Sequence, residues 1–107
     1  MFEVLRYQAE DGSQPFTEWL GSIPDKTIQA RVRVRLGRLE AGLFGDCEPV
    51  GDGVLELREH TGAGWRIYFG RQGRTLVVLL TGGTKRTQSR DIKTAKVLWA
   101  DWKRRQA

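Results

Sequence analysis

The sequence of 107 residues has very few of the residue types that build covalent cross-links or metal sites. Cys47 is the only cysteine and His60 is the only histidine, so an internal disulfide, a cysteine zinc cluster and a multi-histidine site are all excluded. We expect neither a metal nor a cofactor. No segment approaches the ~18 consecutive apolar residues of a membrane span, and the N-terminus lacks a basic stretch followed by an apolar run. We therefore expect a cytoplasmic protein that does not bind membranes.

Positive charge is in excess and lies mostly near the C-terminus. Lysine and arginine number 18 against 13 acidic residues, which gives a net charge of +5 and a pI near 9.9. Such a basic end suits phosphate groups or acidic side chains, although many basic domains have only a solvated face. The basic residues after Thr84 are Lys85, Arg86, Arg90, Lys93, Lys96, Lys103, Arg104 and Arg105.

The hydrophobic pattern predicts one α+β domain over residues 1–107. The expected elements are a strand at 2–7, a short helix capped by Ser13, a long amphipathic helix from Ser22 to Leu43, strands at 54–60, 65–70 and 76–80, and a helix at about 88–103. This order predicts a twisted, mostly antiparallel sheet with helices packed against it. We expect the residues 81–84 to end the last strand. Arg31, Arg35 and Arg38 form a stripe on the long helix, and a solvated face is its simplest explanation.

Alternation along two strands predicts a basic, partly aromatic surface on one face of the sheet. Residues two apart on a strand share a face, so the strand at 54–60 presents its polar side chains together. A hairpin at 61–64 brings polar residues of the next strand beside them. The residues expected on this surface or at its edge are Glu56, Arg58, His60, Arg66, Tyr68, Lys85 and Arg86.

Such a surface suits RNA cleavage by the 2′-hydroxyl of the RNA itself, which needs no metal. Arginine binds phosphate oxygens, a tyrosine ring stacks on a base, and histidine is the usual group for proton transfer. The candidate catalytic residues are Arg58, His60, Arg66 and Lys85, with Tyr68 and Arg86 as candidates for RNA binding. The alternative is an exposed His60 without a role and arginines that pair with Glu56 or Glu59.

Three segments of the second half carry a family resemblance. They are Leu57-Arg58, Gly64-Trp65-Arg66-Ile67-Tyr68-Phe69, and the run Leu79 to Lys85 followed by Gln88 and Arg90-Asp91-Ile92. These segments resemble the RelE/ParE toxin superfamily, and most closely its phage-derived, HigB-like branch of addiction-module killers. The usual forms there are a Leu-Arg strand, a Gly-Tyr-Arg-Val-Tyr-Phe strand and a Gly-Gly-Asp-Lys-Ser-x-Gln turn that leads into Asp-Ile.

The resemblance implies a RelE-like β-α-α-β-β-β-α fold and the toxin of a type II toxin–antitoxin system. The implied activity is a ribosome-dependent, metal-independent mRNA endonuclease. Arg66, Lys85 and Arg58 match the family's functional positions, and the motif adds Gln88 and Arg90 as RNA-binding candidates. The implied partners are the ribosome with its mRNA and a helix-turn-helix, HigA-like antitoxin that covers this basic surface. Operator DNA would be bound only through that antitoxin.

The sequence also departs from the family pattern. Val54 and Glu56 stand where RelE-type enzymes carry a lysine pair, Thr84 replaces the aspartate before the lysine, and Trp65 replaces the hairpin tyrosine. No tyrosine follows Lys85, so the RelE catalytic set does not transfer whole, and a role for His60 is left open. Two alternatives stand beside the nuclease: a non-enzymatic, ParE-like inhibitor of DNA gyrase and an inactive nucleic-acid-binding accessory protein.

Overall fold

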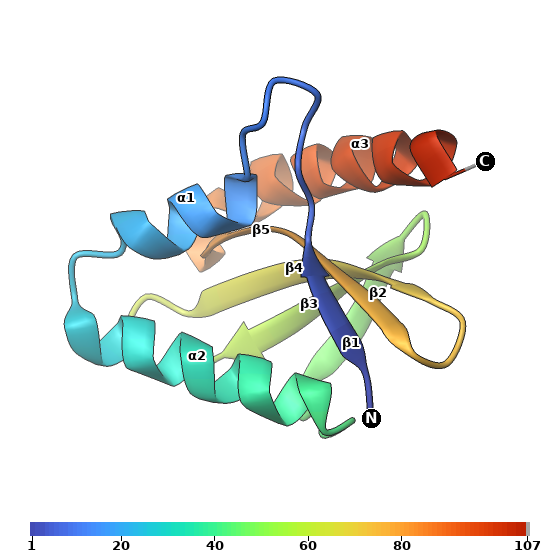
Figure 1. The fold of residues 1–107 in the computed structure, drawn as a ribbon. Coiled ribbons are helices and arrows are strands. Elements are labelled where there is room, and N and C mark those ends of the chain that lie inside the picture. The colour runs from blue at the N-terminus through green and yellow to red at the C-terminus, as the bar shows by residue number, and fades with distance from the viewer. Residues whose placement is uncertain (107) are drawn as a thin grey trace.

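The structure is a computed structural model, and it describes residues 1–106. Its elements are β1 (Glu3–Arg6), α1 (Pro15–Ser22), α2 (Lys26–Glu40), β2 (Cys47–Gly51), β3 (Val54–Glu59), β4 (Trp65–Gln72), β5 (Leu76–Thr84), the 3₁₀ helix η1 (Lys85–Thr87) and α3 (Gln88–Gln106). The strands form one five-stranded sheet in the order β1-β5-β4-β3-β2. β1 runs parallel to β5 and every other pair is antiparallel. The predicted α+β fold is confirmed (Figure 1).

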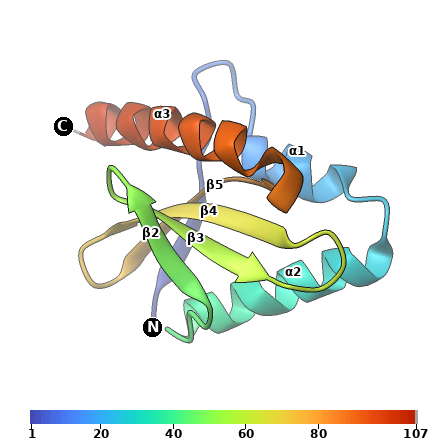
Figure 2. The ribbon, with the colours of Figure 1, turned by 180° about the vertical axis from the view of Figure 1, so that it is seen from behind.

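Helices cover the sheet on both faces, with α2 and α3 on opposite sides in Figures 1 and 2. The side chains of α1 and α2 pack on one face, in a core that includes Phe16, Leu20, Val32, Leu36, Leu39, Leu57, Ile67, Phe69 and Leu79. The other face is covered by α3, in a core that includes Tyr7, Val54, Tyr68, Val78, Leu80, Ala95, Trp99 and Trp102. β5 therefore contributes to both cores, as its unbroken apolar run predicts. No helix within residues 1–106 has the length and apolar character needed to cross a membrane.

The helix boundaries differ from the predicted ones at three caps. Gln14, not Ser13, precedes α1, and it forms no side-chain capping bond. Ser22 ends α1 instead of starting the next helix. α2 begins one residue after Asp25, whose carboxylate accepts a hydrogen bond from the Thr27 backbone N–H at 2.8 Å. A carboxylate at this position also compensates the positive end of the helix dipole.

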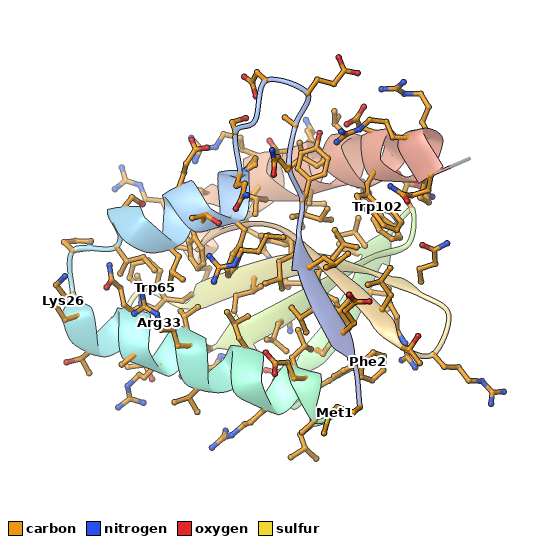
Figure 3. The ribbon with its side chains drawn as sticks, viewed as in Figure 1. Met1, Phe2, Lys26, Arg33, Trp65 and Trp102 are labelled. Atoms are coloured by element: carbon orange, nitrogen blue, oxygen red, sulfur yellow. The ribbon has the colours of Figure 1, made fainter. Side chains whose placement is uncertain are left out.

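The C-terminal end of α2 is earlier than predicted. The helix ends at Glu40, whose carbonyl accepts a hydrogen bond of 2.7 Å from the backbone N–H of Phe2. Figure 3 shows Phe2 beside this end of α2. Gly42 then turns the chain with a φ of 82°, and Leu43 is left exposed. The prediction that the amphipathic helix continues to Leu43 is therefore wrong.

Two features of the sheet were not predicted. β2 is a full edge strand paired with β3, in a segment expected only to lead into strands. β5 continues through Gly82 and Gly83, which were expected to end it. A Cβ on Gly82 would lie 2.3 Å from the Trp19 ring, and one on Gly83 would lie 1.8 Å from the Asp91 carboxylate. These glycines therefore allow close approach of other side chains and do not form a turn.

Arg35 does not belong to a solvated stripe. Its guanidinium donates to the backbone carbonyls of Arg58 and, at 3.3 Å, Phe44. It also forms an ion pair of 3.5 Å with Glu59. Arg35 therefore joins α2 to the end of β3, whereas the other two arginines of the predicted stripe, Arg31 and Arg38, are exposed.

The close packing on Gly82 predicts opposite effects for two glycine substitutions. Gly82→Ala should lower the free energy of unfolding by about 1–3 kcal/mol, because the added methyl group collides with Trp19. Gly37→Ala in α2 should raise it by about 0.5–1 kcal/mol, because alanine favours the helix and no atom lies within 4 Å of the added Cβ. Urea unfolding followed by tryptophan fluorescence measures both changes. A Gly82→Ala protein as stable as the parent would contradict this packing.

Candidate functional site

A fully buried carboxylate lies at the centre of the predicted polar surface. Glu56 in β3 accepts hydrogen bonds from Arg58 Nε at 2.8 Å and from Tyr68 OH at 2.9 Å. It also accepts one from Gln88 Nε2 at 2.9 Å, and Arg66 Nε lies 3.5 Å away. A buried charge is stable only when it is paired and hydrogen-bonded. Glu56 therefore ties β3, β4 and α3 together.

The strand register brings the two arginines together. Arg58 lies directly opposite Arg66, and Glu56 lies opposite Tyr68, in the antiparallel pair of β3 and β4. Both arginines thus lie on the face of the sheet that α3 covers, as the alternation predicts. The internal ion pair between Arg58 and Glu56, which the sequence left open, is also present. The charge of Glu56 offsets part of the positive charge of both arginines.

The protonation of this cluster follows from its contacts. Burial raises the pKa of Glu56, but the hydrogen bonds from Arg58, Gln88 and Tyr68 outweigh this effect, and the pKa lies below its ordinary value. Burial, and then the bond to Glu56, raise the pKa of the Tyr68 hydroxyl. At neutral pH Glu56 is therefore ionised, and Tyr68 keeps the proton that it donates.

Three of the four predicted catalytic residues line one cavity. The side chains of His60, Arg66 and Lys85 surround a volume of about 370 Å³, together with the loop Gly62–Gly64. The carbonyl of Gly64 accepts hydrogen bonds from Arg66 Nη1 at 2.7 Å and from the Lys85 backbone N–H at 3.0 Å. These bonds hold the loop against the end of β5. We call this volume the reaction cavity.

Arg66 reaches the reaction cavity from a nearly buried position. Its Nε faces Glu56, its Nη1 is bound to Gly64, and its side chain is 10% exposed. Lys85 is exposed and forms no side-chain hydrogen bond or ion pair with residues 1–106. The cavity therefore combines an arginine held in place by the protein with a lysine that is free to move.

His60 lies just beyond β3 and is oriented by an aspartate that the sequence did not reveal. The ring is 73% exposed, and its Nε2 donates a hydrogen bond to the carboxylate of Asp46. This hydrogen bond lowers the pKa of Asp46. The Asp46 carbonyl in turn accepts from the Arg58 backbone N–H at 2.9 Å, which fixes its place beside β3. Only the unpredicted pairing of β2 with β3 brings this pair together.

Arg58 does not line the reaction cavity. Its Nη2 forms a second ion pair, at 3.1 Å, with Glu48. The side chain lines a different and larger cavity of about 690 Å³, which it shares with His60. His60 thus lies between the two volumes. The structure separates Arg58 from Lys85, although it places Arg58 and Arg66 on the same face of the sheet.

The predicted RNA-binding residues divide into two groups. Tyr68 is fully buried under α3 and cannot stack on a base, so this prediction is wrong. The half-buried Gln88 donates to Glu56 and supports the cluster. Arg86 in η1 and Arg90 in the first turn of α3 are exposed and follow Lys85 closely in the sequence. Arg90 Nε lies 3.5 Å from the Asp91 carboxylate. Their contact with RNA stays a prediction.

No group of three or more His, Cys, Asp or Glu side chains in the described part of the chain could hold a metal ion.

Comparison with known proteins assigns the family. The family model described as "Phage derived protein Gp49-like (DUF891)" matches residues 18–100, a range that contains the whole site. This chain belongs to the Gp49-like family. A Haemophilus influenzae protein, named only as uncharacterized, is 45% identical to this Gp49-like protein over 83 residues, which cover 78% of this chain and 84% of that protein. Gp49-like proteins are RelE/ParE-like toxins of toxin–antitoxin systems. The resemblance to that superfamily is confirmed, and the HigB-like branch stays a prediction.

The Glu56 cluster of this Gp49-like protein predicts a pH-dependent loss of stability. Glu56→Gln should cost about 3–5 kcal/mol at neutral pH, because it leaves the nearly buried Arg66 without its anionic partner and removes one of the two partners of Arg58. The folded pKa of Glu56 lies below its ordinary value of 4.5. Its stabilising effect is therefore complete above about pH 4.5 and is lost as the pH falls through the folded pKa.

Urea unfolding of the parent and of Glu56→Gln over a range of pH tests this prediction. The difference in unfolding free energy should shrink on acidification below about pH 4. Tyr68→Phe is the matched control, because it removes one hydrogen bond to the carboxylate, should cost about 1.5–3 kcal/mol, and leaves the charge in place. A difference for Glu56→Gln that stays constant with pH would contradict the assignment of an ionised Glu56.

Proposed function

We propose that this protein is the toxin of a type II toxin–antitoxin system and acts as a ribosome-dependent mRNA endonuclease. The observation that carries the proposal is that His60, Arg66 and Lys85 line one cavity. Cleavage by the RNA 2′-hydroxyl needs a proton acceptor, a proton donor and stabilisation of the developing charge, and an imidazole with two cationic side chains can supply all three. Membership in a family of RelE/ParE-like toxins supports the same conclusion.

In the proposed reaction the 2′-oxygen attacks the adjacent phosphorus. The bond from O2′ to phosphorus forms, the bond from phosphorus to O5′ breaks, and the products are a 2′,3′-cyclic phosphate and a 5′-hydroxyl. His60 accepts the 2′-proton through Nδ1, which has no hydrogen-bond partner within residues 1–106 while Nε2 is bound to Asp46. Lys85 donates a proton to the leaving 5′-oxygen. Arg66 stabilises the charge that develops on the phosphoryl oxygens.

Cleavage of mRNA on translating ribosomes tests this mechanism. Lys85→Ala and Arg66→Ala should each lower the cleavage rate by about 10²–10³-fold, since each removes a preorganised contact to the phosphate. Arg33→Ala is the control, because Arg33 is an exposed arginine of α2 that does not line the cavity and the change in charge is the same. Primer extension on the mRNA gives the rates.

The result for Lys85→Ala is decisive, because Lys85 is exposed and removal of its side chain leaves the core packing intact. Circular dichroism of each variant shows whether the fold persists, which matters most for the nearly buried Arg66. If folded Lys85→Ala and Arg66→Ala proteins cut mRNA at the rate of Arg33→Ala, the site is not where we propose it.

The burial of Arg66 and its pairing with Glu56 favour a second candidate. A toxin that acts by binding a protein needs no arginine open to a phosphate, so a ParE-like inhibitor of DNA gyrase fits this feature. The two functions are separated by adding the chain to a DNA supercoiling reaction and to a translation reaction. Inhibited supercoiling with intact mRNA would favour the gyrase inhibitor.

The proposed partners are the ribosome with its mRNA and a helix-turn-helix, HigA-like antitoxin, through which the pair would bind operator DNA. Growth arrest when the chain is produced in a bacterium, reversed by the product of the adjacent reading frame, is the expected result. Normal growth would instead support the inactive accessory protein.

A further inference from the structure

The outer side of α2 has a groove that shares only His60 with the reaction cavity. One part is a cavity of about 330 Å³ along α2, and the other is the cavity of about 690 Å³ beside the loop that follows the helix. The two share the side chains of Arg35, Arg38 and Glu59 as lining. We call them together the α2 groove. Except for His60 and its hydrogen-bond partner Asp46, none of its lining residues has a role in the proposed reaction.

The groove follows a single face of the helix. Its lining residues on α2 recur at three- and four-residue steps, which places them in one row along the helix. From Thr27 to Arg38 this row spans about three turns, or roughly 17 Å. The side chains that α2 buries against the sheet, such as Val32 and Leu36, belong to another face. Five of the six residues in this row are exposed, and the sixth, Arg35, is bound to the end of β3.

The middle of the groove is small and aliphatic. Ala30 and Val34 lie one turn apart, and Val34 is 54% exposed. Leu43, which lines the larger cavity, is 64% exposed. Exposed large aliphatic side chains are few in this chain, and two of them lie on this groove. An aliphatic stripe suits the side chains of a protein better than a nucleic acid, which needs stacking rings and phosphate contacts.

Positively charged side chains line one side of this aliphatic stripe. Arg38 forms no side-chain hydrogen bond or ion pair within residues 1–106, and Arg31 forms only a 3.3 Å hydrogen bond to the Thr61 hydroxyl. Arg35, between them, is held by Glu59 and two backbone carbonyls, so its side chain forms a fixed part of the lining of the groove. Two arginines without acidic partners therefore lie along one side of the aliphatic side chains of Ala30 and Val34.

We propose that the α2 groove binds an acidic amphipathic helix of a partner protein. The aliphatic ridge of that helix would pack on Ala30, Val34 and Leu43, with carboxylates beside Arg31 and Arg38. This is helix-in-groove recognition, with anchors at three- and four-residue steps. His60 also lines the larger cavity, so a helix that fills the whole groove covers His60 and leaves Arg66 and Lys85 uncovered. A helix that covers His60 would inhibit the proposed cleavage. Only this inhibition rests on the proposed function.

A designed peptide tests the docking surface. The probe is a fluorescent helical peptide of about 18 residues, with leucines at three- and four-residue steps and glutamates on both sides of them. The parent chain should bind it, and Val34→Glu and Arg38→Glu should each weaken binding at least about tenfold in fluorescence anisotropy, which is ~1.4 kcal/mol. Val97→Glu is the matched control, because Val97 is also an exposed valine but lies on α3, and it should keep the parental affinity.

Each other outcome overturns the proposal. The proposal is wrong if the acidic peptide does not bind the parent, or if a peptide with lysine in place of glutamate binds equally well. Equal affinities of Val34→Glu and Val97→Glu would place the peptide elsewhere. Self-association of the chain that Val34→Glu abolishes would assign the groove to a second copy, and displacement of the peptide by a short 2′-O-methyl RNA would assign it to RNA.

The cleavage assay separates this inference from the proposed function. Val34 does not line the reaction cavity, so Val34→Glu should cleave mRNA at the parental rate while it loses the peptide. If the parent does not cleave mRNA but binds the peptide in the groove, the docking surface stands and the proposed function fails. If cleavage requires Arg66 and Lys85 but no variant changes peptide binding, the proposed function stands and the inferred docking surface is wrong.

Discussion

The buried carboxylate of Glu56 is the constraint on which the polar half of the molecule depends. Two arginines on neighbouring strands face each other, and like charges directly opposite are destabilising unless an anion lies between them. Glu56 supplies that anion and engages α3 through Gln88. The same contacts orient Arg66 toward the reaction cavity and at the same time limit its exposure. Arg66 therefore contributes both to the stability of the structure and to the proposed chemistry.

This arrangement divides the charges of the site between structural and chemical roles. Arg58 is committed to Glu56 and Glu48, so the cavity depends on Arg66, Lys85 and His60. Thr84 stands where relatives of the RelE type carry an aspartate, and it forms a reciprocal capping pair with Thr87 at the start of η1. Lys85 is thereby held at the cavity without an adjacent acid. The basic site of the Gp49-like protein is thus built from residues that differ from the RelE pattern.

Much of the fold and part of the site could be predicted from the sequence. The period-two alternation correctly places Arg58 and Arg66 on one face, because a short hairpin determines the register of the strands it joins. It does not tell which face a helix will cover, and for this reason Tyr68 was expected at the surface but lies under α3. Asp46 was missed because it reaches His60 only through β2, an edge strand with no clear alternation. Gly82 and Gly83 were taken for a turn because the need for space beside Trp19 and Asp91 is a tertiary effect.

The central claim is that Glu56 holds Arg66 so that it meets a phosphodiester together with Lys85 and His60. The most direct measurement is a titration of the chain with an uncleavable 2′-O-methyl dinucleotide, followed by NMR of the arginine Nε–H, lysine and imidazole resonances. The account predicts that the signals of Arg66, Lys85 and His60 shift together with one dissociation constant, and that the Arg58 Nε–H signal, held by Glu56 and outside the cavity, stays in place. An unchanged Arg66 signal, with shifts confined to other basic residues, would contradict it.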